Sequence, residues 1–449
     1  MPIKNYLNLT DSCENSHLIA SASKKLKGKP MNVLFGFFAV LLSLGSAGQA
    51  IASDSTELDD IRLELAALVS RVAALEAENA ALKLDNASTG RSDDAMGAAA
   101  KGPVLPAPGS DSWTDNIKLT GDFRYRYESL DVQDSADRER NRLRARIRVQ
   151  AAVSDGLKLI VGLASGSVNP VSANQSLGGA GSTKDMGLDL AYLQWSMSDL
   201  LTLRAGKFKN VWFKPEKSEL LWDNDYNPEG FGVSYQSDQV FVHGALNWLE
   251  SDTIKDQSFV IGLQGGLVRQ LGEAKVTAGL GYYELAIAGH RAFLGDEDYF
   301  GNSHTCSGNT AITACGYHYD YEQFQVFAQA ELNLGGYPVV VFAEQVQNLA
   351  VVTADKGWAA GFRLGKAKRA GSWQFGYRYN HLEADAVFGL TSSSDFAGGG
   401  TNARGHIFKG GWAVSEAWTL ALTLFSNEQD MTNGSRDYHR IQVDTQVKF

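Results

Sequence analysis

A ten-residue stretch, "RNRLRARIRV" at positions 140–149, places an arginine at every second residue. Successive side chains of a β-strand point to opposite faces, so this segment has five guanidinium groups on one face and aliphatic residues, Leu143 to Val149, on the other. The five residues, here called the arginine row, are Arg140, Arg142, Arg144, Arg146 and Arg148. A strand with this contrast requires an apolar medium on one side and water or counter-charges on the other.

The same period of two continues from Ile117 to the last residue, Phe449. Short turns such as Ser154-Asp155-Gly156 alternate with longer polar connections, and we count seven of the first and eight of the second. The longer connections lie near 129–139, 166–186, 209–229, 249–257, 286–319, 347–356, 382–403 and 426–437. This alternation predicts sixteen strands with both ends on the short-turn side, which is typical of outer-membrane barrels.

Alternation alone does not choose between a membrane barrel and a soluble β-sandwich, because the charged face of a sandwich also meets water. Three observations favour the barrel: an export signal, sixteen evenly spaced strands, and tryptophans near strand ends that suit interfacial girdles. These tryptophans are Trp195, Trp248, Trp358, Trp373, Trp412 and Trp418. The predicted fold class is all-β, a 16-stranded antiparallel transmembrane β-barrel over residues 113–449, with an N-terminal α-helical coiled coil.

An arginine that faces lipid at mid-depth costs about 2–4 kcal/mol, so the arginine row is expected to face the lumen. Sixteen strands enclose a space too wide for side chains to fill, and an aqueous channel should remain. Besides the row, the predicted pore-lining residues are Arg124, Arg126, Arg204 and Lys207.

The connection at 209–230, "KNVWFKPEKSELLWDNDYNPEG", is rich in aromatic residues and in both signs of charge. One interpretation is a constriction loop that folds into the lumen, where its acids would face the arginine row, Arg204, Lys207 and Lys209. The other is a solvated surface loop. The candidate constriction residues are Lys209, Glu216, Lys217, Glu219, Asp223 and Asp225.

The first 112 residues divide into three segments. Residues 1–52 have lysines before the apolar run "MNVLFGFFAVLLSL" and predict a cleaved signal peptide, cut after Ala52 or Ala50. Residues 53–85 have an apolar seam with alternating steps of three and four, which predicts a periplasmic coiled coil; a lone amphipathic helix is the alternative. Residues 86–112 are expected to be a flexible linker.

Other functional classes find little support in the sequence. A net charge of −10 argues against nucleic acid as a partner, and we expect no catalytic residue, cofactor or metal. The two cysteines after the signal region, Cys306 and Cys315, predict a disulfide in an exported protein. A zinc site with His304 and His318 is the alternative, and a hydrolase built from distant residues is also conceivable.

The quoted motifs resemble those of the putative-porin family of Gram-negative outer-membrane barrels, relatives of the general and phosphate-selective porins. The resemblance is carried by "GDFRYRYES", "RNRLRARIRVQAAV", "DGLKLIVGLASG", "LDLAYLQW", "LLTLRAGKFK" and the terminal "QVKF". It implies a homotrimer in contact with outer-membrane lipid and lipopolysaccharide, and a terminal Phe449 that the barrel assembly machinery reads as an assembly signal.

The sequence therefore favours a porin, a water-filled channel for passive diffusion of small hydrophilic solutes or ions. The arginine row suggests a preference for anions. The alternative is a closed barrel that anchors the outer membrane through the coiled coil, or an adhesin that uses its long loops.

Overall fold

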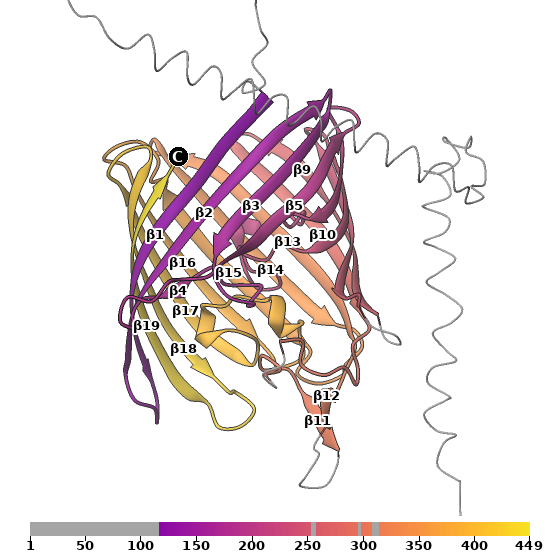
Figure 1. The fold of residues 1–449 in the computed structure, drawn as a ribbon, viewed down its shortest axis with the longest axis vertical. Coiled ribbons are helices and arrows are strands. Elements are labelled where there is room, and N and C mark those ends of the chain that lie inside the picture. Colours follow the sequence, from indigo (N-terminus) through magenta and orange to yellow (C-terminus); the bar gives the residue numbers. More distant parts are fainter. Residues whose placement is uncertain (1–115, 253–256, 295–297, 308–313) are drawn as a thin grey trace, which may run out of the picture. The chain divides into compact units, whose positions relative to one another are not determined.

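The computed structural model describes residues 116–252, 257–294, 298–307 and 314–449. Sixteen long strands form one closed antiparallel sheet in which β1 pairs with both β2 and β19 (Figure 1). They are β1 (Ile117–Val132), β2 (Arg138–Ser154), β3 (Leu157–Ser165), β5 (Met186–Ser196), β6 (Leu201–Lys207), β7 (Glu229–Gln236), β8 (Val240–Glu250), β9 (Ser258–Leu271), β10 (Ala274–Leu285), β13 (Tyr321–Leu334), β14 (Tyr337–Asn348), β15 (Lys356–Gly365), β16 (Trp373–Leu382), β17 (Ala403–Ala413), β18 (Trp418–Gln429) and β19 (Arg436–Lys448). The predicted sixteen-stranded barrel is confirmed.

Short turns lie at one rim of the barrel, together with the C-terminus, and the longer loops lie at the opposite rim (Figure 1). The loops hold two elements that the periodicity did not predict. A two-residue strand, β4 (Gln175–Ser176), pairs with β2, and a small hairpin joins β11 (His304–Ser307) to β12 (Ala314–Tyr317). Three short 3₁₀ turns complete the loops, at Pro215–Lys217, Gly389–Thr391 and Phe396–Gly398.

The two faces of the barrel wall differ as the alternation predicts. On β2, Arg144 is only 6% exposed, whereas Ile147 on the other face is 46% exposed. The same outward exposure of large apolar side chains recurs around the barrel, for instance at Leu263, Leu280 and Val326. An apolar outer surface of this extent needs lipid rather than water, so the guanidinium groups face inward.

Aromatic side chains lie at both ends of the outer wall. Trp195, Trp373, Trp412 and Trp418 are exposed beside the short turns, while Trp358 is exposed beside the long loops. Tryptophan places an apolar ring and a polar N–H at the border between hydrocarbon and water. These positions match the interfacial girdles expected from the sequence.

The last residue closes the seam between β1 and β19. The Phe449 N–H donates to the carbonyl of Gly121 at 3.0 Å, and the Gly121 N–H donates to the Phe449 carbonyl at 2.9 Å. A Cβ at position 121 would overlap the Phe449 ring, so glycine is the residue that allows the ring to lie against β1. The terminal aromatic residue thus has a structural partner on the first strand.

We expect Phe449→Ala to lower the amount of folded barrel in the outer membrane several-fold, because both the ring contact and the proposed assembly signal are lost. The measurement is the heat-modifiable band on a semi-native gel of outer membranes. Phe449→Tyr keeps an aromatic ring and should retain most of the folded protein. Equal yields for the alanine variant and the unaltered chain would contradict this prediction.

The signal peptide, coiled coil and linker predicted for residues 1–112 lie outside the described residues. Among the described residues, no helix is long and apolar enough to cross a membrane.

The hairpin of β11 and β12 is joined by a disulfide between Cys306 and Cys315, which are paired opposite each other in the register. Among the described residues, no cluster of three or more side chains could hold a metal ion.

Candidate functional site: the charged inner wall and its loops

The arginine row is matched by carboxylates on the neighbouring strand. On β1, Asp122 accepts from Arg144 at 2.9 Å and from Arg146 at 2.7 Å. Asp122 and Arg146 are directly opposite each other in the register of β1 and β2, so the pairing follows from the strand alignment. Asp122 thereby neutralises part of the positive charge of Arg144 and Arg146.

Glu128, also on β1, holds the other end of the row. Its carboxylate is fully buried and lies 2.6 Å from Arg140, 3.4 Å from Arg142 and 2.7 Å from Arg440 of β19. Arg126 approaches the same carboxylate at 3.6 Å. One acid therefore serves four guanidinium groups, and the buried charges depend on it.

The loop between β6 and β7, residues 208–228, packs against the inner face of the barrel wall. Its apolar residues Trp212, Leu221 and Trp222 are buried against inward side chains of the wall formed by β8 to β16, including Tyr283 and Phe342. The rings of Trp222 and Tyr283 lie 5.2 Å apart, edge to face. A loop with this many large apolar residues would be costly in water, and the inner wall offers the surface that buries them.

The acids of this loop do not all face the arginine row, and that part of the prediction is wrong. Only Asp225 reaches the row, at 3.3 Å from Arg144 and 3.0 Å from Arg146. The others contact different partners: Glu216 pairs with Arg363 of β15, Glu219 lies 3.9 Å from Arg378 of β16, and Asp223 accepts from the Ser394 N–H. The reason is the apolar anchorage of the loop, which turns its first half toward β15 and β16.

The three lysines of the loop also differ. Lys214 donates to the carbonyls of Trp222 and Asp223 at 3.2 Å and ties the loop together. Lys217 is exposed and has no ion pair among the described residues. Lys209, at the base of the loop, is half-buried and close to the row. The loop crosses the lumen, packed on one wall and ion-paired with the other.

A second inward loop, 383–402, was not predicted. Its apolar residues from Ala386 to Leu390 are buried in the same cluster as loop 208–228. Its Asp395 lies 3.1 Å from Arg126 and 2.9 Å from Arg440. The sequence signal was the run "AVFGL" in a connection otherwise assigned to solvent, because such a run needs burial.

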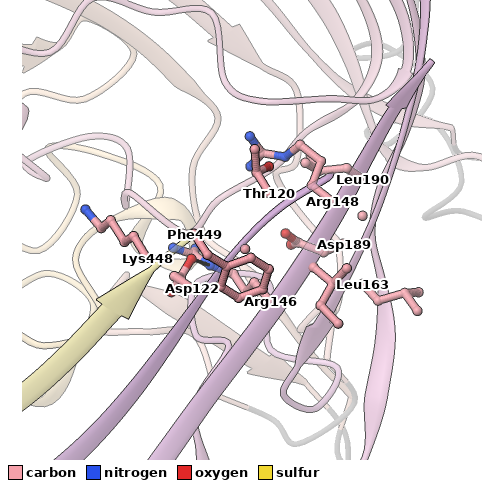
Figure 2. A pocket seen from close by; sticks show the side chains of 12 residues that line it. Thr120, Asp122, Arg146, Arg148, Leu163, Asp189, Leu190, Lys448 and Phe449 are labelled. Carbon is pink, nitrogen blue, oxygen red and sulfur yellow. Dashed lines mark hydrogen bonds and ion pairs between the residues drawn. The ribbon is translucent and has the colours of Figure 1, made fainter. Parts of the chain in front are cut away.

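Positive charge remains in excess on this wall. Eight arginines of β1, β2 and β19 face five carboxylates: Asp122, Glu128, Asp225, Asp395 and Asp444. Of these eight, two form no ion pair among the described residues: Arg124, which donates to Asn174 Oδ1 at 2.7 Å, and Arg148. Figure 2 shows Arg146 and Arg148 beside Asp122 and Asp189 near the C-terminal Phe449, around a cavity of about 280 Å³.

The other predicted pore-lining cations lie further along the wall. Arg204 of β6 donates to Ser234 Oγ at 2.9 Å and has no carboxylate partner among the described residues. Lys207 pairs with Glu229 at 2.9 Å, at the loop end of the same strand. Arg204 therefore keeps its full charge in the lumen, and the charge of Lys207 is compensated.

Burial sets the protonation of the loop groups. Burial lowers the pKa of Lys209 to about 8, although Asp189 and Asp225 act in the opposite direction. Burial opposes ionisation of Asp225, but Arg144 and Arg146 hold its pKa below the ordinary value. Burial and the charges of Glu219 and Asp225 raise the pKa of Asp223. Asp225 is therefore an anion at neutral pH and a lasting partner of the row.

A closed barrel with an apolar outer wall, a charged inner wall and an inward loop defines an outer-membrane channel protein. The family model described as "Putative porin" matches residues 131–287 and 303–449, more than half of the chain. The protein thus belongs to the putative porin family, as the motifs suggested.

One solved structure shares this fold, and others are more distantly similar. OprB of Pseudomonas putida, in its high pH structure, has a TM-score of 0.51 and 12% sequence identity, over 75% of this chain and 94% of that chain. In-vitro folded OmpT, an outer membrane protein of Vibrio cholerae in trimer form, has a TM-score of 0.45 and 13% identity, over 74% and 99%. No curated protein matches the chain.

Proposed function

We propose that the protein is a passive channel for small hydrophilic solutes that favours anions. One observation carries the preference: the inner wall of β1, β2 and β19 holds more guanidinium groups than carboxylates. Arg124, Arg148 and Arg204 supply the uncompensated charge at separate heights of the lumen. A net positive lining attracts anions and repels cations within a Debye length.

The assembly around the barrel is part of the proposal. We expect three copies to associate, with residues 53–85 as a periplasmic coiled coil after removal of 1–52, and with 86–112 as the linker to the barrel. The resemblance to porins and the heptad seam support this arrangement. Outer-membrane lipid and lipopolysaccharide would surround the apolar wall.

The test is a planar-bilayer recording in a salt gradient. We expect stable open steps and a reversal potential on the anion-selective side. The double variant Arg124→Gln and Arg148→Gln should shift the reversal potential toward zero, because it removes charges that no carboxylate compensates. The control is Arg404→Gln, an exposed residue paired with Glu428, which should leave selectivity unchanged. A barrel without conductance would favour the anchor or adhesin.

The buried Lys209 predicts a dependence on pH. Lysine is charged below its pKa, so raising the pH from 6 to 9 passes through the value of about 8 and removes one positive charge from the lumen. The permeability ratio of anion to cation should then fall by roughly 1.5- to 2-fold. Reversal potentials measured at both pH values test this, and Lys209→Arg, which stays charged, should flatten the change. An equal fall in that variant would assign the effect to other groups.

A further inference from the structure

A second cavity lies on the short-turn side of the base of loop 208–228. It encloses about 450 Å³ and is lined by inward residues of β5, β6, β7 and β8, by the turn at Asp199 and Leu200, and by residues 209–211 and 213 of the loop. It is separate from the ion-paired row, since it shares none of the acids that bind the row.

Strand register brings the polar groups of this cavity together. Gln194 of β5 is opposite Arg204 of β6, and Thr202 of β6 is opposite Ser234 of β7. Ser234 is in turn opposite His243 of β8. Four adjacent strands therefore present a guanidinium, an amide, two hydroxyls and an imidazole to one space.

Two buried donors or acceptors in this cavity lack a partner among the described residues. They are His243 Nδ1 and Asn210 Nδ2. His243 is only 8% exposed, so water reaches its ring poorly. A buried polar atom without a partner is costly, and here both atoms belong to side chains that line the cavity. This is the pattern expected where a solute supplies the missing hydrogen bonds.

The charges indicate which solute. The fixed charges that line the cavity are Arg204, Lys209 and Asp199, with a net value of one positive charge. Among the described residues, Arg204 forms a side-chain hydrogen bond to the neutral Ser234 and no ion pair, so a guanidinium edge is available for an oxyanion. The remaining polar lining consists of amides, hydroxyls and one imidazole: Gln194, Asn210, Gln236, Tyr192, Thr202, Ser234 and His243. Such groups bind hydroxyl groups rather than charges.

We infer that this cavity is a binding site for a small hydroxylated monocarboxylate, with its carboxylate at Arg204 and Lys209 and its hydroxyls at the amides. The inference rests on the proposed channel function and adds a solute class to it. A solute that passes the ion-paired constriction pauses here before it leaves at the short-turn rim. Binding must be weak enough for release, as conduction through a selective pore requires.

The experiment measures block of chloride current through the full chain in a planar bilayer by gluconate, with glucose and propionate as comparisons. Gluconate should reduce the current in a saturable manner, while glucose lacks the charge and propionate lacks the hydroxyls, so both should act more weakly. Arg204→Gln should raise the half-blocking gluconate concentration about tenfold, the loss of one charge-assisted contact. Arg204→Lys should retain part of the block, and Arg404→Gln, outside the cavity, should retain all of it.

If gluconate blocks the current, two outcomes would still overturn the site. One is equal block by glucose and gluconate; the other is an unchanged half-blocking concentration in Arg204→Gln. Open channels that gluconate does not block would reject the site while the channel function stands. Absence of channels would reject the proposed function itself, so the two failures are distinguishable.

Discussion

Replacing residues 210–226 by a short Gly-Ser linker should raise the single-channel conductance about threefold. The loop crosses the lumen, with Trp212 and Trp222 packed on one wall and Asp225 paired with Arg144 and Arg146 on the other. Without residues 210–226, ions could use the space that the loop now occupies between the two walls. The anion preference should fall at the same time, because wider pores screen their wall charges more fully.

The matched control is removal of residues 178–183, an exposed segment at the tip of loop 166–185. Its conductance should equal that of the unaltered chain. Both deletion variants must first show the folded, heat-modifiable band on a gel. An unchanged conductance after removal of 210–226 would mean that the loop does not limit the current.

The substitution Glu128→Gln should be the most destabilising single change on the inner wall. The carboxylate is fully buried and serves Arg140, Arg142 and Arg440 at 2.6 to 3.4 Å. Its loss removes the ion-pair partner of Arg140 and Arg142, while Arg440 keeps Asp395. Breaking a buried pair in this way costs about 3–5 kcal/mol. Urea unfolding of the detergent-solubilised barrel, followed by tryptophan fluorescence, measures the free energy of unfolding.

Glu428→Gln provides the comparison, since Glu428 forms an ion pair of the same type with Arg404 at 2.7 Å but at the surface. Exposed pairs are screened by water, so its midpoint should hardly move. Equal midpoints for the two variants would show that the network around Glu128 does not hold the wall together. A more anion-selective channel is a second expected result for Glu128→Gln.

The wall of the barrel was predictable from the sequence because it depends on local alternation. Arg144 and Ile147 differ in burial since a strand has only two faces and the lipid accepts only one of them. Strand number followed from the turns. The six tryptophans were placed for the same reason, since their preference for the interface is a property of the side chain.

The interior was less predictable because it depends on contacts between distant residues. Asp225 lies about 80 positions from Arg146 along the chain, and Asp395 lies much further from Arg126. The row was expected to face the acids of the connection at 209–230, whereas only Asp225 of that loop reaches it and Asp122 and Glu128 of β1 supply its other carboxylates. Only Asp122 and Glu128, on the neighbouring strand, were within reach of a register argument. The second inward loop carried a signal, its apolar run, that strand periodicity does not detect.

The anchorage of the two inward loops has a consequence for where solutes travel. Trp222, Tyr283 and Phe388 belong to an apolar cluster that fills part of the lumen, while two cavities with charged linings lie along β3 to β8, from Lys207 and Asp225 to Arg204. We expect solutes to pass along these strands rather than along the central axis. Substitutions in the apolar cluster would alter how tightly the two inward loops are held. Substitutions among the residues that line the cavities would alter which solutes pass.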